Sequence, residues 1–215
     1  MNIGVKTEQI EIDARAANYV FLIDVSGSMQ GEDRIGLVKK SLNILTNSLT
    51  EKDRIALVTY ASGVKTVLDS TPADEKGKEK ILRAIDDLKA GGSTFGSGGI
   101  ERAYSVAYDN RIVNGNNRVI MMSDGDFNVG ITGGGSLSEF IAEKAESGIS
   151  LSVLGFGMGN TRDSVLEKLA RNGNGNYAYI DNETEAKKVF ERELDGMLIT
   201  VAKDAKAGVT FNADT

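Results

Sequence analysis

The chain has 215 residues, of which 40% are apolar and 26% charged, as expected for one globular domain with a short remainder. It contains no histidine and no cysteine, which excludes His- or Cys-based catalysis, zinc sites built from those residues, and disulfides. The net charge of −6 disfavours binding to nucleic acid or to an anionic membrane surface. Any bound metal is therefore expected to be a hard cation held by oxygen.

Short apolar segments alternate with amphipathic ones from residue 19 onward. Continuous β-branched or aromatic runs, typical of buried parallel strands, predict strands at residues 19–23, 55–58, 119–122, 149–154 and 177–180. Residues 64–68 follow a Ser-Gly turn and are predicted to form a short antiparallel edge strand. Apolar residues three or four apart predict helices, with stripes that begin at Ile35, Ile81, Ile100, Leu137, Val165 and Ala186. The alternation predicts an α/β fold, with helices on both faces of a mostly parallel central sheet.

Two segments lie outside this alternation. Residues 9–14 predict an additional strand, and the sequence from residue 198 onward alternates like strands of another unit. We therefore expect an N-terminal extension at 1–17, the α/β domain at 18–195, and the start of an accessory region at 196–215 that continues in a longer protein. No apolar run approaches the roughly 20 residues needed to span a bilayer, and the sequence after Met1 does not resemble a signal peptide.

Oxygen-bearing side chains follow the predicted strands at the points where these strands end. Asp24, Ser26 and Ser28 follow the first strand, Asp124 follows the strand at 119–122, and Thr94 lies in a Gly-Gly-Ser-Thr loop between them. Each residue alone is readily explained as a helix cap or turn former. Because ligands of parallel sheets bind at the carboxyl ends of the strands, the five together favour a cation site.

Such a site has room for a further ligand. Mg²⁺ takes about six oxygens in near-octahedral geometry at roughly 2.0–2.1 Å. Three hydroxyls and two carboxylates leave at least one position free, and carboxylates bound through water would leave the ion much of its charge. The ion would then attract a carboxylate from outside. Asp126 is open to two interpretations, a cap of the following loop or a member of the outer shell of the metal.

These motifs resemble the von Willebrand factor type A (vWA) domain over roughly residues 18–195. Asp24, Ser26, Ser28, Thr94 and Asp124 match its metal-ion-dependent adhesion site position by position. The resemblance implies a Rossmann-like fold and a divalent cation, Mg²⁺ foremost, with Mn²⁺ or Ca²⁺ as the other candidates. It also implies that the two serines and the threonine coordinate this cation, that the aspartates assist directly or through water, and that a partner's acidic residue completes the shell.

The resemblance implies a non-catalytic, metal-dependent protein–protein interaction module. The motif sequences are most similar to a bacterial subgroup of envelope or secreted proteins, which implies an extracytoplasmic location. One alternative is a scaffolding domain of a larger assembly that does not use its metal for ligand binding. The other is a Mg²⁺-dependent phosphohydrolase with Asp24 as nucleophile, but such enzymes usually carry a second aspartate two residues later, where this chain has Ser26.

Overall fold

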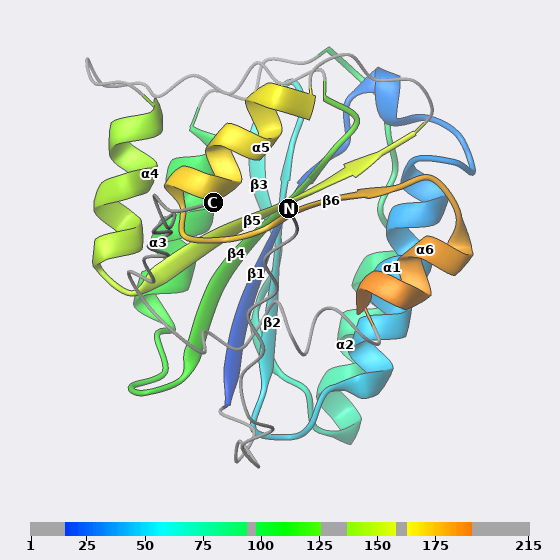
Figure 1. Cartoon of the computed structure of the whole chain (residues 1–215). Helices are drawn as coiled ribbons and strands as arrows, with labels where there is room; N and C mark the ends of the chain where they lie inside the picture. Colours follow the sequence, from blue (N-terminus) through cyan, green and yellow to red (C-terminus); the bar gives the residue numbers. More distant parts are fainter. Residues whose placement is uncertain (1–15, 94–97, 126–136, 158–162, 191–215) are drawn as a thin grey trace, which may run out of the picture.

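The computed structural model describes residues 16–93, 98–125, 137–157 and 163–190, and shows a six-stranded sheet with the order β3-β2-β1-β4-β5-β6 (Figure 1). All neighbouring strands are parallel except the antiparallel pair β2 and β3. The predicted mostly parallel α/β fold is confirmed. The strands are β1 (Ala17–Asp24), β2 (Arg54–Tyr60), β3 (Val64–Pro72), β4 (Asn116–Ser123), β5 (Ile149–Phe156) and β6 (Tyr177–Ile180).

The antiparallel strand β3 is longer than the predicted segment 64–68. It continues to Pro72, which pairs with Arg54 at the start of β2. The added residues are polar and partly exposed, because β3 lies at the edge of the sheet and has one open side. A prediction based on apolar residues alone therefore placed the end of this strand too early.

Helices cover both faces of the sheet (Figure 1). Helices α1, α2 and α6 lie on one side, and α3, α4 and α5 lie on the other. The described helices are α1 (Ile35–Ser48), α2 (Glu75–Asp86), α3 (Gly99–Asp109), α4 (Leu137–Glu146), α5 (Asp163–Asn172) and α6 (Glu183–Lys188). Among the described residues, no helix has both the length and the apolar character needed to cross a membrane.

The continuous apolar run of β1 serves two separate cores. Tyr19, Phe21 and Ile23 pack in the core on the side of α1, α2 and α6, whereas Val20 and Leu22 pack in the core on the opposite side. All five side chains are at most 3% exposed. A central strand buried on both faces needs an apolar residue at nearly every position, which is why β1 shows no polar alternation.

The strand register brings the carboxyl ends of the central strands to one edge of the sheet. Asp24 at the end of β1 pairs with Tyr60 at the end of β2, and Ser123 at the end of β4 pairs with Gly155 of β5. The chain builds outward from β1 through β2 to β3, and from β4 through β5 to β6, so the strand order reverses between β1 and β4. The loops after these two strands therefore flank the point where ligands of open α/β sheets bind.

Some predicted features lie outside the described residues. They include the strand at residues 9–14, the strand-like sequence from residue 198 onward, and two of the candidate polar residues, Thr94 and Asp126.

The hydroxyl of Tyr104 on α3 offers a test of the packing on one face of the sheet. The residue is 1% exposed, its hydroxyl has no hydrogen-bond partner among the described residues, and burial raises its pKa above the usual value of a tyrosine. An unsatisfied buried hydroxyl costs about 1–3 kcal/mol. Tyr104→Phe keeps the edge-on ring contact with Phe140 and is expected to raise the melting temperature by roughly 2–4 °C per kcal/mol gained.

The matched control for this variant is Tyr60→Phe. The hydroxyl of Tyr60 is equally buried but donates a hydrogen bond to Asp24. Calorimetry should therefore show opposite shifts for the two variants, upward for Tyr104→Phe and downward for Tyr60→Phe. A lower melting temperature for Tyr104→Phe would mean that its hydroxyl is satisfied in solution.

Candidate metal centre

The loop after β1 brings two serine hydroxyls together. Ser26 is fully buried, Ser28 is half-buried, and their Oγ atoms lie 3.0 Å apart. Between them the chain makes one 3₁₀ turn, η1 (Gly27–Met29), in which the amide of Met29 donates to the carbonyl of Ser26. Two ligands at right angles around an ion at roughly 2.1 Å would lie about 3.0 Å apart. The two hydroxyls therefore fit neighbouring positions of a Mg²⁺ octahedron.

The carboxylate of Asp24 is fully buried beneath these serines. Its Oδ1 accepts a hydrogen bond from the amide of Ser26 at 2.9 Å. Its Oδ2 accepts one from the hydroxyl of Tyr60 at 3.1 Å and one from the hydroxyl of Ser123 at 3.3 Å. Both carboxylate oxygens therefore accept hydrogen bonds, and the side chain of Ser26 also interacts with this carboxylate. Asp24 thus orients the loop that carries the two serines.

The electrostatic environment of Asp24 favours the arrival of a cation. Burial raises its pKa above the ordinary value, the hydrogen bonds from Ser26 and Tyr60 oppose this rise, and the carboxylate of Asp124 adds to it. The net effect is a raised pKa, so negative charge at this position is poorly compensated by the protein alone. A divalent ion would supply the missing positive charge.

Asp124 follows β4 at the same edge of the sheet and is half-buried. The next residue, Gly125, has a φ of +91°, and its amide donates to the Ser123 hydroxyl at 3.1 Å. Asp124 directly follows Ser123, whose hydroxyl donates to Asp24, and its charge contributes to the raised pKa of Asp24.

The loop that leads into Thr94 is joined to the β1 loop by two backbone hydrogen bonds. The amide of Gly91 donates to the carbonyl of Val25 at 2.8 Å, and the amide of Gly27 donates to the carbonyl of Gly92 at 2.9 Å. Gly92 has a φ of +90°, and a Cβ there would lie 2.7 Å from the hydroxyl oxygen of Ser62. Glycine is therefore required at this position, and the chain reaches the site immediately before Thr94.

The structure thus brings together four of the five predicted ligands, Asp24, Ser26, Ser28 and Asp124, whereas Thr94 lies outside the described residues. Within the described part of the chain, no group of three or more acidic residues could hold a metal ion by itself. A cation at this edge would therefore depend on the serine hydroxyls. The donor set, hydroxyls with two carboxylates, has the hard-oxygen chemistry that Mg²⁺ and Mn²⁺ prefer.

Two residues of the site were missed by sequence reasoning. Tyr60 and Ser123 hold the carboxylate of Asp24 in place, and burial together with the charge of Asp24 raises the pKa of Tyr60 well above its ordinary value. Both residues occupy the last position of a strand next to β1. The strand ends were visible in the sequence, and searching them for hydroxyl groups would have found both residues.

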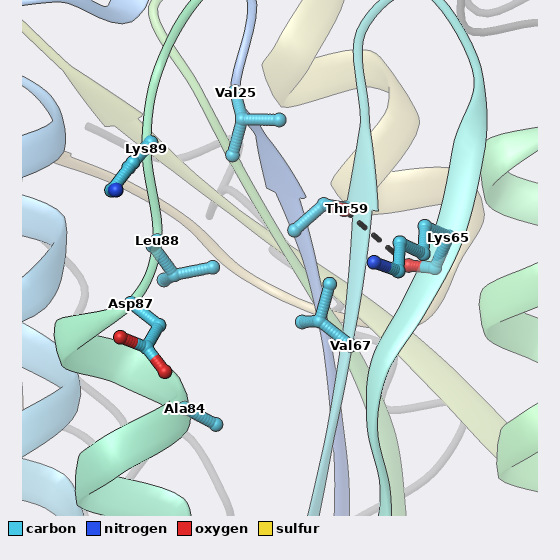
Figure 2. Close-up of a pocket in the computed structure, with 8 residues that line it drawn as sticks. All are labelled: Val25, Thr59, Lys65, Val67, Ala84, Asp87, Leu88 and Lys89. Carbon is cyan, nitrogen blue, oxygen red and sulfur yellow. Dashed lines mark hydrogen bonds between the residues drawn. The ribbon is translucent and has the colours of Figure 1, made fainter.

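A cavity of about 480 Å³ lies beside the candidate site, between the end of α2 and strands β2 and β3 (Figure 2). Val25, Val67 and Leu88 point into it, and the exposed residues Lys65 and Lys89 border it. Val25 stands between Asp24 and Ser26 in the sequence, so the cavity and the candidate metal centre share this loop. The cavity is lined by Val25, Thr59, Lys65, Val67, Ala84, Asp87, Leu88 and Lys89.

Comparison with known families identifies the domain. The family model of the von Willebrand factor type A domain matches residues 18–192. The chain belongs to this family. Domains of the vWA family commonly mediate protein–protein interaction or adhesion.

The vWA domain of this chain is also similar to individual proteins. The uncharacterized protein YfbK of Escherichia coli is 46% identical over 197 residues, which are 92% of this chain and 34% of YfbK. The chain therefore spans about a third of the length of that relative. A von Willebrand factor type A structure from Catenulispora acidiphila superposes with a TM-score of 0.68 at 20% identity, covering 86% of this chain and 43% of that one.

A third similarity covers a whole structure. An aerotolerance-related membrane protein from Bacteroides fragilis superposes with a TM-score of 0.62 at 19% identity, over 85% of this chain and 100% of that chain. At such identities the two structural similarities establish the shared fold.

Proposed function

We propose that this chain is a non-catalytic, metal-dependent protein–protein interaction module. Ser26, Ser28 and Thr94, assisted by Asp24 and Asp124, would hold a divalent cation, with Mg²⁺ first and Mn²⁺ or Ca²⁺ as alternatives. An acidic residue of a partner protein would complete the coordination shell. The observation that carries the proposal is the pair of serine Oγ atoms 3.0 Å apart, next to a buried carboxylate.

The hydrogen bonds of Asp24 support a binding role over phosphohydrolase chemistry. A nucleophilic carboxylate needs a free oxygen to attack the phosphorus atom. Oδ2 of Asp24 accepts from two hydroxyls and Oδ1 accepts from a backbone amide, so neither oxygen is free of hydrogen bonds. The position two residues later is Ser26, whose hydroxyl cannot act as an acid near neutral pH.

The border of the neighbouring cavity supports an acidic partner. Lys65 and Lys89 line this cavity and are exposed, and Asp87 is the one acidic residue of the lining (Figure 2). An acidic segment that also contacts this cavity would be attracted by these two ammonium groups. Attraction of this kind acts mainly on association rate and selectivity.

We further propose that the interaction module extends over residues 18–195 and that residues 196–215 begin an accessory region of a longer protein. An extracytoplasmic location is proposed on the resemblance of the motif sequences to bacterial envelope and secreted vWA proteins. Immunodetection of the full-length protein in fractionated cells of its source would test this location.

Metal binding is expected to stabilise the folded chain. An ion at about 100 times its dissociation constant adds roughly 2.7 kcal/mol, which corresponds to a rise in melting temperature of roughly 5–11 °C for a domain of this size. The measurement is thermal unfolding with Mg²⁺ or Mn²⁺ and with EDTA. Ser26→Ala should remove the shift. Ser41→Ala, which alters a buried serine of α1 bonded to the carbonyl of Leu37, should retain it.

The outcome that overturns the proposal is a wild-type chain whose unfolding is unaffected by any of the three cations. Partner capture separates the interaction role from the scaffolding alternative. Full-length protein should retain a partner in Mg²⁺ and release it in EDTA, and Ser26→Ala should not capture it. Capture that persists in EDTA would favour a scaffold that does not use its metal.

A further inference from the structure

The side chain of Arg34 connects the metal loop with the end of β5. Its Nη1 donates to the carbonyl of Ser28 at 2.5 Å. At the other loop, a Cβ on Gly157 would lie 2.8 Å from Nε and 3.1 Å from Cγ of Arg34. Gly157 has a φ of +89°, so this position favours glycine for both conformation and space. The guanidinium therefore lies directly against the backbone that follows β5.

The hydrogen bond from Arg34 uses a carbonyl that the η1 turn leaves free. Within the turn, the amide of Met29 donates to Ser26 and the amide of Gln30 donates to Gly27. The carbonyl of Ser28 receives Arg34 instead. A hydrogen bond from a charged donor is roughly twice as strong as a neutral one. Together with the bond from the Gly27 amide to the loop at Gly92, it holds the turn from two sides.

We infer that Arg34 is a positioning residue of the proposed metal centre. By fixing the carbonyl of Ser28 against the end of β5, it keeps the Ser28 hydroxyl 3.0 Å from that of Ser26 before any cation binds. The inference rests on the proposed function, because it concerns the affinity of the same site. Arg34 also contacts Gly157 directly after β5, so it couples the metal loop to the end of this strand.

The charge of Arg34 and its positioning role have opposite effects on the affinity of the site for a cation. A guanidinium next to a divalent cation repels it, so a purely electrostatic role predicts tighter metal binding when the charge is removed. A positioning role predicts weaker binding, because the two hydroxyls are no longer held in place. The sign of the change in affinity therefore distinguishes the two accounts.

The experiment measures the Mn²⁺ dissociation constant of the whole chain by electron paramagnetic resonance. Arg34→Met is expected to raise this dissociation constant about tenfold, which corresponds to the loss of one charge-assisted hydrogen bond. It should also broaden the spectrum of bound Mn²⁺. Arg34→Lys, which keeps a donor, should recover part of the affinity. The control is Lys39→Met on α1, the helix that begins directly after Arg34; it removes a 2.8 Å bond from Lys39 to the Asp86 carbonyl. It should leave Mn²⁺ binding unchanged.

Two further measurements keep the inference testable should Arg34→Met fold poorly. Gly157→Ala retains the charge of Arg34 but displaces its side chain, and it should also weaken Mn²⁺ binding. In metal-free protein, Arg34→Lys should speed hydrogen exchange at the amides of Met29 and Gln30. Wild-type protein that binds no Mn²⁺ overturns the proposed function and, with it, the role of Arg34. Wild-type protein that binds Mn²⁺, with Arg34 variants that bind as tightly or more tightly, overturns only the positioning role.

Discussion

Asp24→Asn is expected to raise the melting temperature of the metal-free protein and to abolish its stabilisation by Mg²⁺. Burial raises the pKa of Asp24, so the fold disfavours the ionised carboxylate. Asparagine has the same shape, and its Oδ1 can accept from the amide of Ser26. Its Nδ2 can donate to the hydroxyls of Tyr60 and Ser123, which can also act as acceptors. The uncharged variant can therefore keep a hydrogen bond to each of the three groups, with the two hydroxyls now accepting, and it avoids the cost of a buried charge.

The effect of Asp24 depends on pH with a definite sign. A carboxyl group whose folded pKa lies above its unfolded value of 3.8 contributes stability that is complete below the unfolded value and is lost as pH rises through the folded value. Metal-free wild-type protein should therefore lose stability across that interval relative to Asp24→Asn. Mg²⁺ requires the ionised form, so the stabilisation by metal should grow across the same interval.

Thermal unfolding of both proteins from about pH 4 to pH 8, with EDTA or with Mg²⁺, measures both effects. In Mg²⁺ the variant should lack the wild-type gain of roughly 5–11 °C. The matched control is Asp53→Asn, since Asp53 accepts bonds from the amides of Ala17 and Thr50 away from the site. That variant should keep the metal shift. If Asp24→Asn showed the full rise in melting temperature with Mg²⁺, Asp24 would not belong to the metal centre. If its melting temperature without metal were lower than that of the wild type, the protein would compensate the charge of Asp24 well.

The order of strands and helices could be predicted because buried strands and amphipathic helices have distinct periodicities. This periodicity of apolar residues is weak wherever a helix or strand is exposed to solvent. Helix α2 begins at Glu75, although its apolar stripe begins at Ile81. Its first turn is largely charged, and the signal for its start is Asp74, whose side chain accepts from the amide of Gly77. The polar second half of β3 was missed for the same physical reason.

The candidate ligands could be predicted because strand ends in a parallel sheet meet at one edge. The residues that support them depend on finer geometry. Tyr60 reaches Asp24 because the register places the two residues side by side at the ends of β2 and β1. Arg34 reaches Ser28 through the conformation of a loop. Neither register nor loop conformation follows from the spacing of apolar residues, so the contacts that these two residues make appear only in the structure.

Gly77→Ala is expected to destabilise the chain strongly, against the prediction of helix propensity. Alanine is favoured over glycine inside a helix by about 1 kcal/mol, and Gly77 lies in α2. In the structure, however, a Cβ at this position would lie 1.7 Å from the carbonyl oxygen of Pro72. Since the contact is with backbone, no side-chain rotation can relieve it. The first turn of α2 must move away from the end of β3.

The movement should also weaken the cap of α2. Asp74 accepts from the Gly77 amide at 2.7 Å, and loss of such a cap costs about 1 kcal/mol. With about 1–3 kcal/mol for the overpacked contact, the expected net loss, after the gain in propensity, is about 2 kcal/mol, or roughly 4–8 °C in melting temperature. Calorimetry of Gly77→Ala and of the control Gly63→Ala, whose Cβ would meet nothing within 4 Å, tests this value. If Gly77→Ala were the more stable of the two variants, α2 could not lie as close to β3 as the structure places it. The course of the chain from α2 to the candidate metal centre would then also differ from the one described.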